Sequence, residues 1–367
     1  MPGDPWHGGT VIVWSLQEFK MNGAIGRRGF LGRTAALAAG APLMLQGNLH
    51  AQQAVPPPPK QFKKIGVEEH WTALNVIEAA GRTPSGTANR QADLDAIRLG
   101  EMDAAGVTMQ VISNSSYQFL TDAAKATDLA KVNNEILAEA VVKHPTRFAG
   151  MAALPTQDPK AAVAELERAV TKLKLRGAMI EGQDHVHWEF LDSQAFRPLW
   201  ECAASLEVPL YLHPNIPNSE SVKLLEGHAE VQNLMWAGAI YTGTQVLRII
   251  GSGVFDEFPK AKLILGHLGE LLPYWLGRLD EGARAWKVKK PPSAYIKENI
   301  FISTSGHYHP EALTCAINAI GSDHILFATD FAAVNGDLAV QFFERTPMSD
   351  EDRERIYHLN AERLFKL

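Results

Sequence analysis

The sequence predicts one domain of the α/β class, a single (β/α)8 TIM barrel that follows a cleavable signal segment. From residue 63 onward, short β-branched and apolar runs alternate with segments of helical periodicity, and there are eight such runs. Several runs are apolar nearly throughout, which is typical of parallel strands buried on both faces. A doubly wound open sheet is the alternative, but no glycine-rich phosphate turn follows the first strand.

The apolar runs and the helical segments between them give the expected bounds of the strands and helices. Strands are predicted over residues 64–70, 107–113, 148–154, 177–181, 208–213, 263–267, 300–305 and 325–330. Helices are predicted over residues 128–142, 159–173, 196–206, 231–251, 272–286, 310–320 and 350–367. Asp158 followed by Pro159 is a typical helix start.

Composition limits the classes of partner. The 367 residues are 46% hydrophobic and 21% charged, which are globular proportions with enough length for a large core. The formal net charge of -6 argues against a nucleic-acid partner or an anionic membrane surface.

The N-terminal region differs from the rest and predicts export. Arg27 and Arg28 precede an apolar run, 35–45, that is too short to span a bilayer, and Ala51 ends a plausible cleavage site. The paired arginines resemble a twin-arginine signal. We therefore expect a signal region over residues 1–51 and a protein that is periplasmic or secreted; an uncleaved amphipathic anchor is the alternative.

Two further boundaries follow from the same region. Met21 is an alternative start, which would leave residues 1–20 untranslated. Residues 52–62 contain four consecutive prolines, Pro56 to Pro59, and are expected to form an extended linker. The barrel is expected to occupy residues 63–367.

Polar residues gather where five of the predicted strands end. In a barrel of this kind the chemistry lies at the carboxyl ends of the strands. Glu68 and His70 are two apart on the first strand, so their side chains share a face, and Glu69 should point outward to the helices. The other metal-capable or titratable residues at strand ends are Glu181, His213, His267, Glu270 and Asp330.

These residue types predict a metal centre. A mixed set of carboxylates and imidazoles suits zinc, manganese or iron. Glu68, His70, His213 and Asp330 would be the ligands and leave positions open for water or substrate. His267 then remains as a general acid/base that Glu270 could orient, with a fifth-ligand or structural role as the alternatives.

Longer motifs show a family resemblance. They are Val67-Glu68-Glu69-His70, Val208-Pro209-Leu210-Tyr211-Leu212-His213-Pro214, Gly253-Val254-Phe255-Asp256-Glu257-Phe258-Pro259, Leu265-Gly266-His267-Leu268-Gly269-Glu270, Thr304-Ser305-Gly306, Ile325-Leu326-Phe327-Ala328-Thr329-Asp330 and Asn360-Ala361-Glu362-Arg363-Leu364-Phe365. From about Lys64 to Leu367, the chain resembles the decarboxylase branch of the amidohydrolase superfamily (the amidohydrolase-2 or ACMS-decarboxylase-like branch), especially the γ-resorcylate and 2,3-dihydroxybenzoate decarboxylases.

The resemblance implies roles for individual residues. Glu68, His70, His213 and Asp330 match the metal ligands, His267 matches the catalytic histidine beside the metal-bound aspartate, and Arg278 matches a basic residue near the substrate. It implies one divalent metal ion, Mn²⁺ or Zn²⁺, because no lysine is placed to bridge two metals. We also expect a small carboxylic acid as substrate and a homo-oligomer, a dimer or tetramer.

Three features depart from that pattern. Phe331-Ala332-Ala333-Val334-Asn335 replaces the usual Trp-Pro-Phe-Glu type of segment after the last aspartate, and His185 and His187 follow the fourth strand. The export signal is the third, because aromatic catabolic enzymes of this type are cytosolic. Each departure favours a hydrolase over a decarboxylase.

These residues lead to three functional hypotheses. The first is non-oxidative decarboxylation of a hydroxylated aromatic acid, with Asp330, protonated and paired with His267, delivering a proton to the ring. The second is metal-assisted hydrolysis of a lactone or similar carbonyl compound. The complete acid/base set disfavours the third, a non-catalytic binding protein. The candidate aromatic walls of the pocket, each an equal candidate for plain core, are Trp71, Tyr117, Trp188 and Phe331.

The N-terminal motif gives a testable expectation. Changing Arg27 and Arg28 together to lysine should retain the protein in the cytoplasm, because twin-arginine recognition distinguishes the two cations. Cell fractionation measures this, and N-terminal sequencing of the mature form should begin near Gln52. Unchanged periplasmic protein in the double variant would exclude the twin-arginine route.

Overall fold

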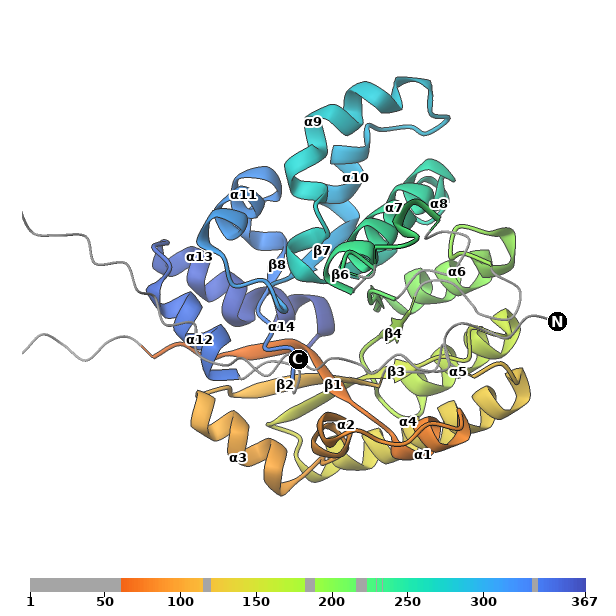
Figure 1. Cartoon of the computed structure of the whole chain (residues 1–367), viewed down its shortest axis with the longest axis vertical. Coiled ribbons are helices and arrows are strands. Elements are labelled where there is room, and N and C mark those ends of the chain that lie inside the picture. The colour runs from red at the N-terminus through yellow and green to blue at the C-terminus, as the bar shows by residue number, and fades with distance from the viewer. Residues whose placement is uncertain are drawn as a thin grey trace, which may run out of the picture. The chain divides into compact units, whose positions relative to one another are not determined.

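The computed structural model describes residues 61–114, 120–181, 189–215, 223–228, 230–232, 234–331 and 336–367. Eight parallel strands lie in the order in which they occur in the chain, and each pairs with the next (Figure 1). The strands are β1 (Ile65–Trp71), β2 (Met109–Asn114), β3 (Phe148–Ala153), β4 (Ala178–Ile180), β5 (Pro209–Leu212), β6 (Lys262–Leu265), β7 (Ile300–Ser303) and β8 (Ile325–Leu326). The predicted α/β barrel is confirmed at this level.

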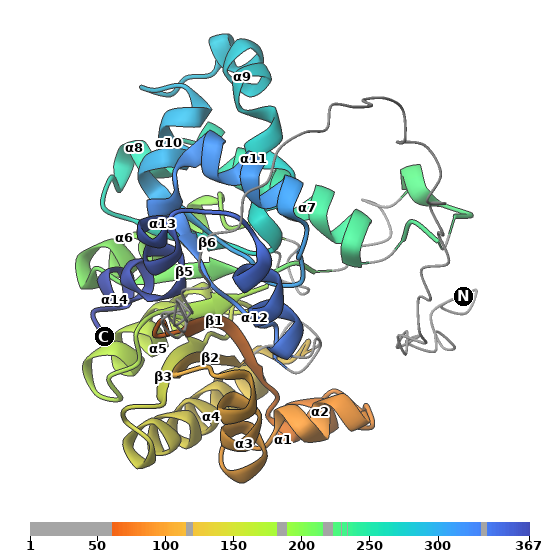
Figure 2. The same cartoon turned by 90° about the vertical axis from the view of Figure 1, so that its left-hand side faces the viewer.

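Helices surround the strands (Figure 2). Eight of them correspond to the seven helical segments expected from the sequence: α4 (Ala123–Lys143), α5 (Pro159–Thr171), α6 (Arg197–Leu206), α7 (Ala239–Gly251), α9 (Leu272–Gly282), α11 (Pro310–Ile320) and, for the last segment, α13 (Asp350–Glu354) with α14 (Asn360–Phe365). None of the helices in the described part of the chain is long and apolar enough to cross a bilayer.

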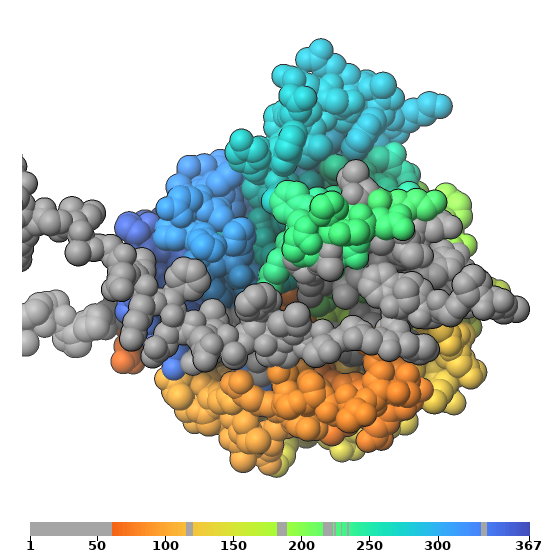
Figure 3. Space-filling view, in the orientation of Figure 1, coloured from red at the N-terminus to blue at the C-terminus, as the bar shows by residue number. Residues whose placement is uncertain are grey.

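Six helices were not expected. They are α1 (Leu74–Ala79), α2 (Gly86–Gln91), α3 (Ala96–Ala105), α8 (Val254–Glu257), α10 (Pro292–Asn299) and α12 (Gly336–Arg345). Most are short. Pro292 occupies the first helical position of α10 and follows Pro291, and such a proline pair suggests a turn in sequence alone. Helices α9 and α10 project from the rest of the barrel as one lobe (Figure 3).

The apolar residues form two layers. A small inner core fills the barrel and contains Ile65, Val67, Met151 and Tyr211. A larger outer core, which includes Trp200, lies between the strands and the helices. Alternate residues of each strand supply the two layers.

Several expected elements end earlier or change type. The last strand was predicted over 325–330 but pairs only over Ile325–Leu326. The helix predicted over 231–251 is a π-helix at Leu234–Gly238 followed by α7, and that over 350–367 contains a π-helical turn at Arg355–Leu359. Periodicity detects helical residues, but it does not resolve these changes of backbone hydrogen bonding.

Two backbone hydrogen bonds join the first strand to the chain that follows the last one. The amide of Val67 donates to the carbonyl of Phe327 (2.8 Å), and the amide of His70 donates to that of Phe331 (3.0 Å). These bonds close the barrel at the end where the predicted site residues lie.

Candidate active site

A β-bulge on the first strand places two of the predicted ligands. Val67 pairs with Val111 but Glu69 pairs with Ile112, so Glu68 is the extra residue, and its φ is +83°. Val67 faces the inner core, so strict alternation would turn His70 outward. The extra residue shifts the alternation by one position, so the side chains of Glu68 and His70 both reach the mouth of the barrel, as predicted.

Glu69 faces the opposite side, also as predicted. Its carboxylate folds over Gly66, where an added β-carbon would come within 2.2 Å of Glu69 Oε1. It accepts hydrogen bonds from Gln110 on β2 and from Thr329.

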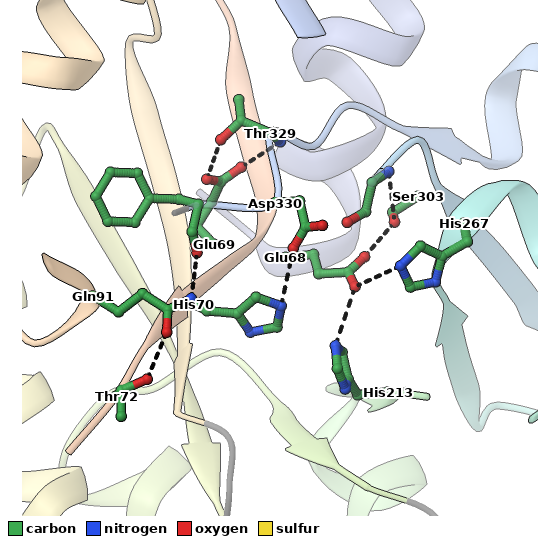
Figure 4. A network of polar contacts seen from close by, with 12 residues as sticks. Glu68, Glu69, His70, Thr72, Gln91, His213, His267, Ser303, Thr329 and Asp330 are labelled. Atoms are coloured by element: carbon green, nitrogen blue, oxygen red, sulfur yellow. Dashed lines mark hydrogen bonds and ion pairs between the residues drawn. The ribbon is translucent and has the colours of Figure 1, made fainter. Parts of the chain in front are cut away.

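Glu68, His70 and His213 form a compact group. One possible ligand atom from each lies within 4.8 Å of the other two. Glu68 Oε1 is 3.5 Å from His213 Nε2, and the rings of His70 and His213 are nearly perpendicular, with centroids 4.8 Å apart. Figure 4 shows the three side chains converging from β1 and the end of β5.

Asp330, the fourth predicted ligand, borders this group. Its Oδ1 is 3.4 Å from His70 Nε2, and its backbone is left-handed, with φ +56° (Figure 4). Burial raises the pKa of Asp330, but the hydrogen bond and charge of His70 outweigh it, so the pKa lies below its usual value. The four predicted ligands are therefore brought together at one mouth of the barrel.

One oxygen of Glu68 is fully occupied by hydroxyl groups. The Tyr211 hydroxyl donates to Glu68 Oε2, and the Ser303 hydroxyl donates to the same oxygen at 2.6 Å. The other oxygen, Oε1, is buried and has no hydrogen-bond partner among the described residues. A buried carboxylate oxygen without a partner is costly, and it fits a bound cation.

Sequence reasoning missed these two hydroxyl residues. Tyr211 is two positions before His213 on β5 and therefore shares its side of the strand, a signal that was available. Ser303 ends β7, which carries no metal-capable residue. Tyr211 and Ser303 act by donating hydrogen bonds to a predicted ligand, so a pattern of metal-ligand residue types alone does not include them.

The histidines differ in charge. Burial holds the pKa of His213 well below its usual value, so the ring is neutral and offers a lone pair. Burial also acts to lower the pKa of His70, but the hydrogen bond that its ring donates to Asp330 and the charges of Asp330 and Glu68 raise it overall. Neutral imidazole with carboxylate is the donor chemistry that a divalent transition metal needs.

His267 lies at the edge of the group and is held by Glu270. Its Nδ1 is 2.7 Å from Glu270 Oε1, and its Nε2 is 3.9 Å from Glu68 Oε1. Burial lowers the pKa of His267, but Glu68 and Glu270 outweigh it and raise the pKa to about 10. The ring therefore carries a proton, which suits the predicted acid role.

A glycine lies against both candidate proton carriers. A β-carbon at Gly306 would come within 3.3 Å of Asp330 Oδ2 and within 3.3 Å of His267 Cδ2. Gly306 has φ +59°, so the chain needs glycine there both for its conformation and for the space beside these two side chains.

The predicted substrate residues have other contacts. Trp71 is buried in the outer core and donates to the carbonyl of Ala92, and the ring of Phe331 lies 4.0 Å from the guanidinium of Arg98. Both positions favour a role in the hydrophobic core over a role as a wall of the substrate pocket. Arg278 is exposed on α9, 5.9 Å from the ring of Trp275, and its substrate contact stays a prediction.

The remaining calls lie outside the described residues. They are Tyr117, Trp188, His185, His187 and residues 332–335, together with the expected signal region, 1–51, and residues 52–60 of the expected linker. Glu181, at the end of β4, accepts a backbone hydrogen bond from the side chain of Asn215.

Metal content distinguishes a ligand from an acid/base residue. His70→Ala should lose metal and activity together, whereas His267→Asn should keep the metal and lower kcat by about 10²–10⁴-fold, the usual contribution of a positioned general acid or base. Metal stoichiometry beside kcat for both variants measures this. If His267→Asn empties the site as fully as His70→Ala, His267 is a ligand.

Comparison with known proteins shows the family to which the chain belongs. The amidohydrolase family model matches residues 55–367. The γ-resorcylate decarboxylase of Polaromonas sp. (strain JS666) is 39% identical over 323 residues, which cover 83% of this chain and 98% of the relative.

Solved structures give the same result. A 2,6-dihydroxybenzoate decarboxylase in complex with 2,6-dihydroxybenzoate aligns with TM-score 0.79 and 36% identity, over 84% of this chain and 100% of its own. A dihydroxybenzoic acid decarboxylase from Polaromonas sp. JS666, with bound manganese and the inhibitor 2-nitroresorcinol, aligns with TM-score 0.78 and 37% identity, over 84% and 98%. This chain belongs to the amidohydrolase family, in the branch that contains the γ-resorcylate and dihydroxybenzoate decarboxylases.

Proposed function

We propose that this chain is a metal-dependent carboxy-lyase that removes the carboxylate of a hydroxylated aromatic acid without oxidation, with 2,6-dihydroxybenzoate as the first substrate to test. The observation that carries the proposal is the likeness to γ-resorcylate decarboxylases over almost their whole length, 98% in the Polaromonas protein. The acid, carboxylate and imidazole groups that such chemistry requires meet at one mouth of the barrel.

Glu68, His70, His213 and Asp330 would hold one divalent ion, and we propose Mn²⁺ rather than Zn²⁺. The manganese in the related Polaromonas structure supports this choice. Bound there, the ion would supply a positive charge that orients an aromatic carboxylate and its neighbouring phenolate oxygen and withdraws electron density from them.

The proton comes from the chain's own residues. His267 is protonated on the basis of its raised pKa, and Glu270 fixes its ring through Nδ1. Its Nε2 faces the ligand group, so the proton on that atom points to where a substrate would bind. The sequence interpretation gave the proton to Asp330, protonated and paired with His267, and His267 is a second candidate donor at the same mouth.

The reaction is balanced without an oxidant or a reductant. A proton adds to the ring carbon that carries the carboxylate, and aromaticity is lost. The bond from that carbon to the carboxylate then breaks, carbon dioxide leaves, and the electron pair of the bond restores the aromatic ring. The side chain that gave the proton is recharged from solvent.

The hydrolase alternative would use the same ligands. Its sequence support came from segments 184–188 and 332–335, which lie outside the described residues, and from the export signal. The named relatives that match over nearly their whole length are decarboxylases, and this outweighs those departures.

Location and assembly remain proposals. We keep export through the twin-arginine signal, and its support is the sequence of residues 27–51 together with a family match that begins only at residue 55. The expected homo-oligomer also stays a prediction.

Decarboxylation can be measured directly. Protein loaded with Mn²⁺ and given 2,6-dihydroxybenzoate should form resorcinol and carbon dioxide in equal amounts. In deuterium oxide, each resorcinol should carry one deuterium at the carbon that lost the carboxylate, because the new proton comes from an exchangeable side chain. A chelator should stop the reaction, and added Mn²⁺ should restore it.

His228→Asn serves as the matched control for His267→Asn. His228 is an exposed histidine that pairs with Glu230 on the surface, so its variant should keep the wild-type rate. Hydrolysis of a lactone, with no carbon dioxide released from any hydroxybenzoate, would contradict the decarboxylase and favour the hydrolase.

A further inference from the structure

The chain after β8 is held by side chains as well as by the two backbone hydrogen bonds from β1. The amide of Ala328 donates to Thr304 Oγ1 (3.1 Å), and the carbonyl of Thr329 accepts from the Tyr308 hydroxyl (3.2 Å). The carbonyl of Phe331 accepts from the Gln91 side chain (3.2 Å) as well as from the amide of His70. Asp330 lies in the middle of this segment.

Glu69 makes the most extensive of these contacts. Its Oε1 accepts from the amide of Thr329 at 2.8 Å, and its Oε2 accepts from the hydroxyl of the same residue (Figure 4). Its Oε2 also accepts from Gln110 Nε2 at 3.0 Å. Glu69 is fully buried and binds Thr329 through both oxygens, so it fixes the residue that directly precedes Asp330.

Asp330 needs such support because its own backbone is unfavourable. A φ of +56° is left-handed, and residues with a side chain avoid this region unless their surroundings impose it. The left-handed turn is what brings Asp330 Oδ1 to within 3.4 Å of His70 Nε2. Releasing Thr329 would let the chain relax and move this carboxylate away from the ligand group.

We propose that Glu69 is a positioning residue for the metal centre, whose carboxylate clamps Thr329 and so holds Asp330 at the ligand group. Glu69 does not itself point into the mouth, and it acts through Thr329. The inference rests on the proposed function only in assigning a metal to this site.

Arg98 on α3 links Glu69 to the proposed ligand His70. Its Nη1 donates to Gln110 Oε1 (3.0 Å), which leaves the Nε2 of Gln110 directed at Glu69. Its Nη2 donates to the carbonyl of His70 (2.6 Å). The buried guanidinium of Arg98 therefore contacts the backbone of His70 directly. Through Gln110 it also orients the carboxylate of Glu69, which holds the segment that contains Asp330.

Metal affinity separates positioning from a purely structural role. Glu69→Gln removes one charged acceptor and keeps the size of the side chain. Thr329→Val removes only the hydroxyl and leaves the charge of Glu69 in place, and Thr329→Ser restores a hydroxyl. The dissociation constant for Mn²⁺ is measured by titrating metal-free protein, and the melting temperature of the metal-free protein reports on folding.

Glu165→Gln is the matched control. Glu165 is also a buried carboxylate with both oxygens bonded, to Asn134 and Arg168, but it lies on α5 in the helical layer. Its variant should lower the melting temperature and leave the Mn²⁺ dissociation constant unchanged.

Glu69→Gln is expected to weaken Mn²⁺ binding by about 10- to 100-fold, the range usual for residues that orient metal ligands. Thr329→Val should weaken it by about tenfold, at the lower end of that range, and Thr329→Ser should restore it. The electron paramagnetic resonance spectrum of bound Mn²⁺ should change in the two weakened variants, because the arrangement of ligands changes.

Three results would overturn the proposal. The first is a Glu69→Gln variant that loses melting temperature as Glu165→Gln does and binds Mn²⁺ normally. The second is weaker binding in Glu69→Gln with normal binding in Thr329→Val, which would assign the effect to charge alone. The third is weak binding in Thr329→Ser equal to that in Thr329→Val. If Glu69→Gln does not fold, the two Thr329 variants decide. Because binding is measured without substrate, failure of the clamp is distinguishable from failure of the decarboxylase.

Discussion

The buried carboxylate of Glu68 is the constraint on which the site depends. A carboxylate removed from water must be paired or hydrogen-bonded, or its charge is strongly disfavoured. Tyr211 and Ser303 satisfy one oxygen from the inner face of the barrel, and the other oxygen faces His213 and His267 without a hydrogen bond. A divalent ion at this point would compensate the charge, and the neutral His213 ring is ready to bind the same ion.

Backbone strain collects around this carboxylate. Among the described residues, left-handed side-chain-bearing positions include Glu68 after β1 begins, His267 and Glu270 after β6, and Asp330 after β8. Each is a titratable residue, Glu68 within β1 and the others beyond the carboxyl end of a strand. Strained positions persist only where the surroundings impose them, and here the contacts of Glu69, Arg98 and the two hydroxyl groups on Glu68 supply that support.

The sequence predicted the strands and the gathering of polar residues at one mouth of the barrel, because apolar runs and polar strand ends are local features. It also placed the side chains of Glu68 and His70 on one side of the strand. The structure reaches this arrangement through a β-bulge at Glu68, which an alternating pattern of residues does not predict. The chain beyond Leu326 was expected to be strand, but beside two backbone bonds from β1 it is bonded by side chains distant in sequence, such as Glu69 and Thr304. Contacts of this kind leave no periodic pattern. The helix α3, with its buried Arg98, was missed for a related reason, since a charged residue in the sequence suggests an exposed surface.

The central claim is that Glu68, His70, His213 and Asp330 bind a single metal ion. Anomalous diffraction from crystals of the protein loaded with Mn²⁺ tests this most directly, because the manganese signal locates the ion independently of the protein atoms. One peak per chain is expected, in contact with Glu68 Oε1 and with the rings of His70 and His213, and adjacent to Asp330. Two peaks per chain at the barrel mouth, or one peak bound elsewhere while these four residues stay empty, would contradict the claim.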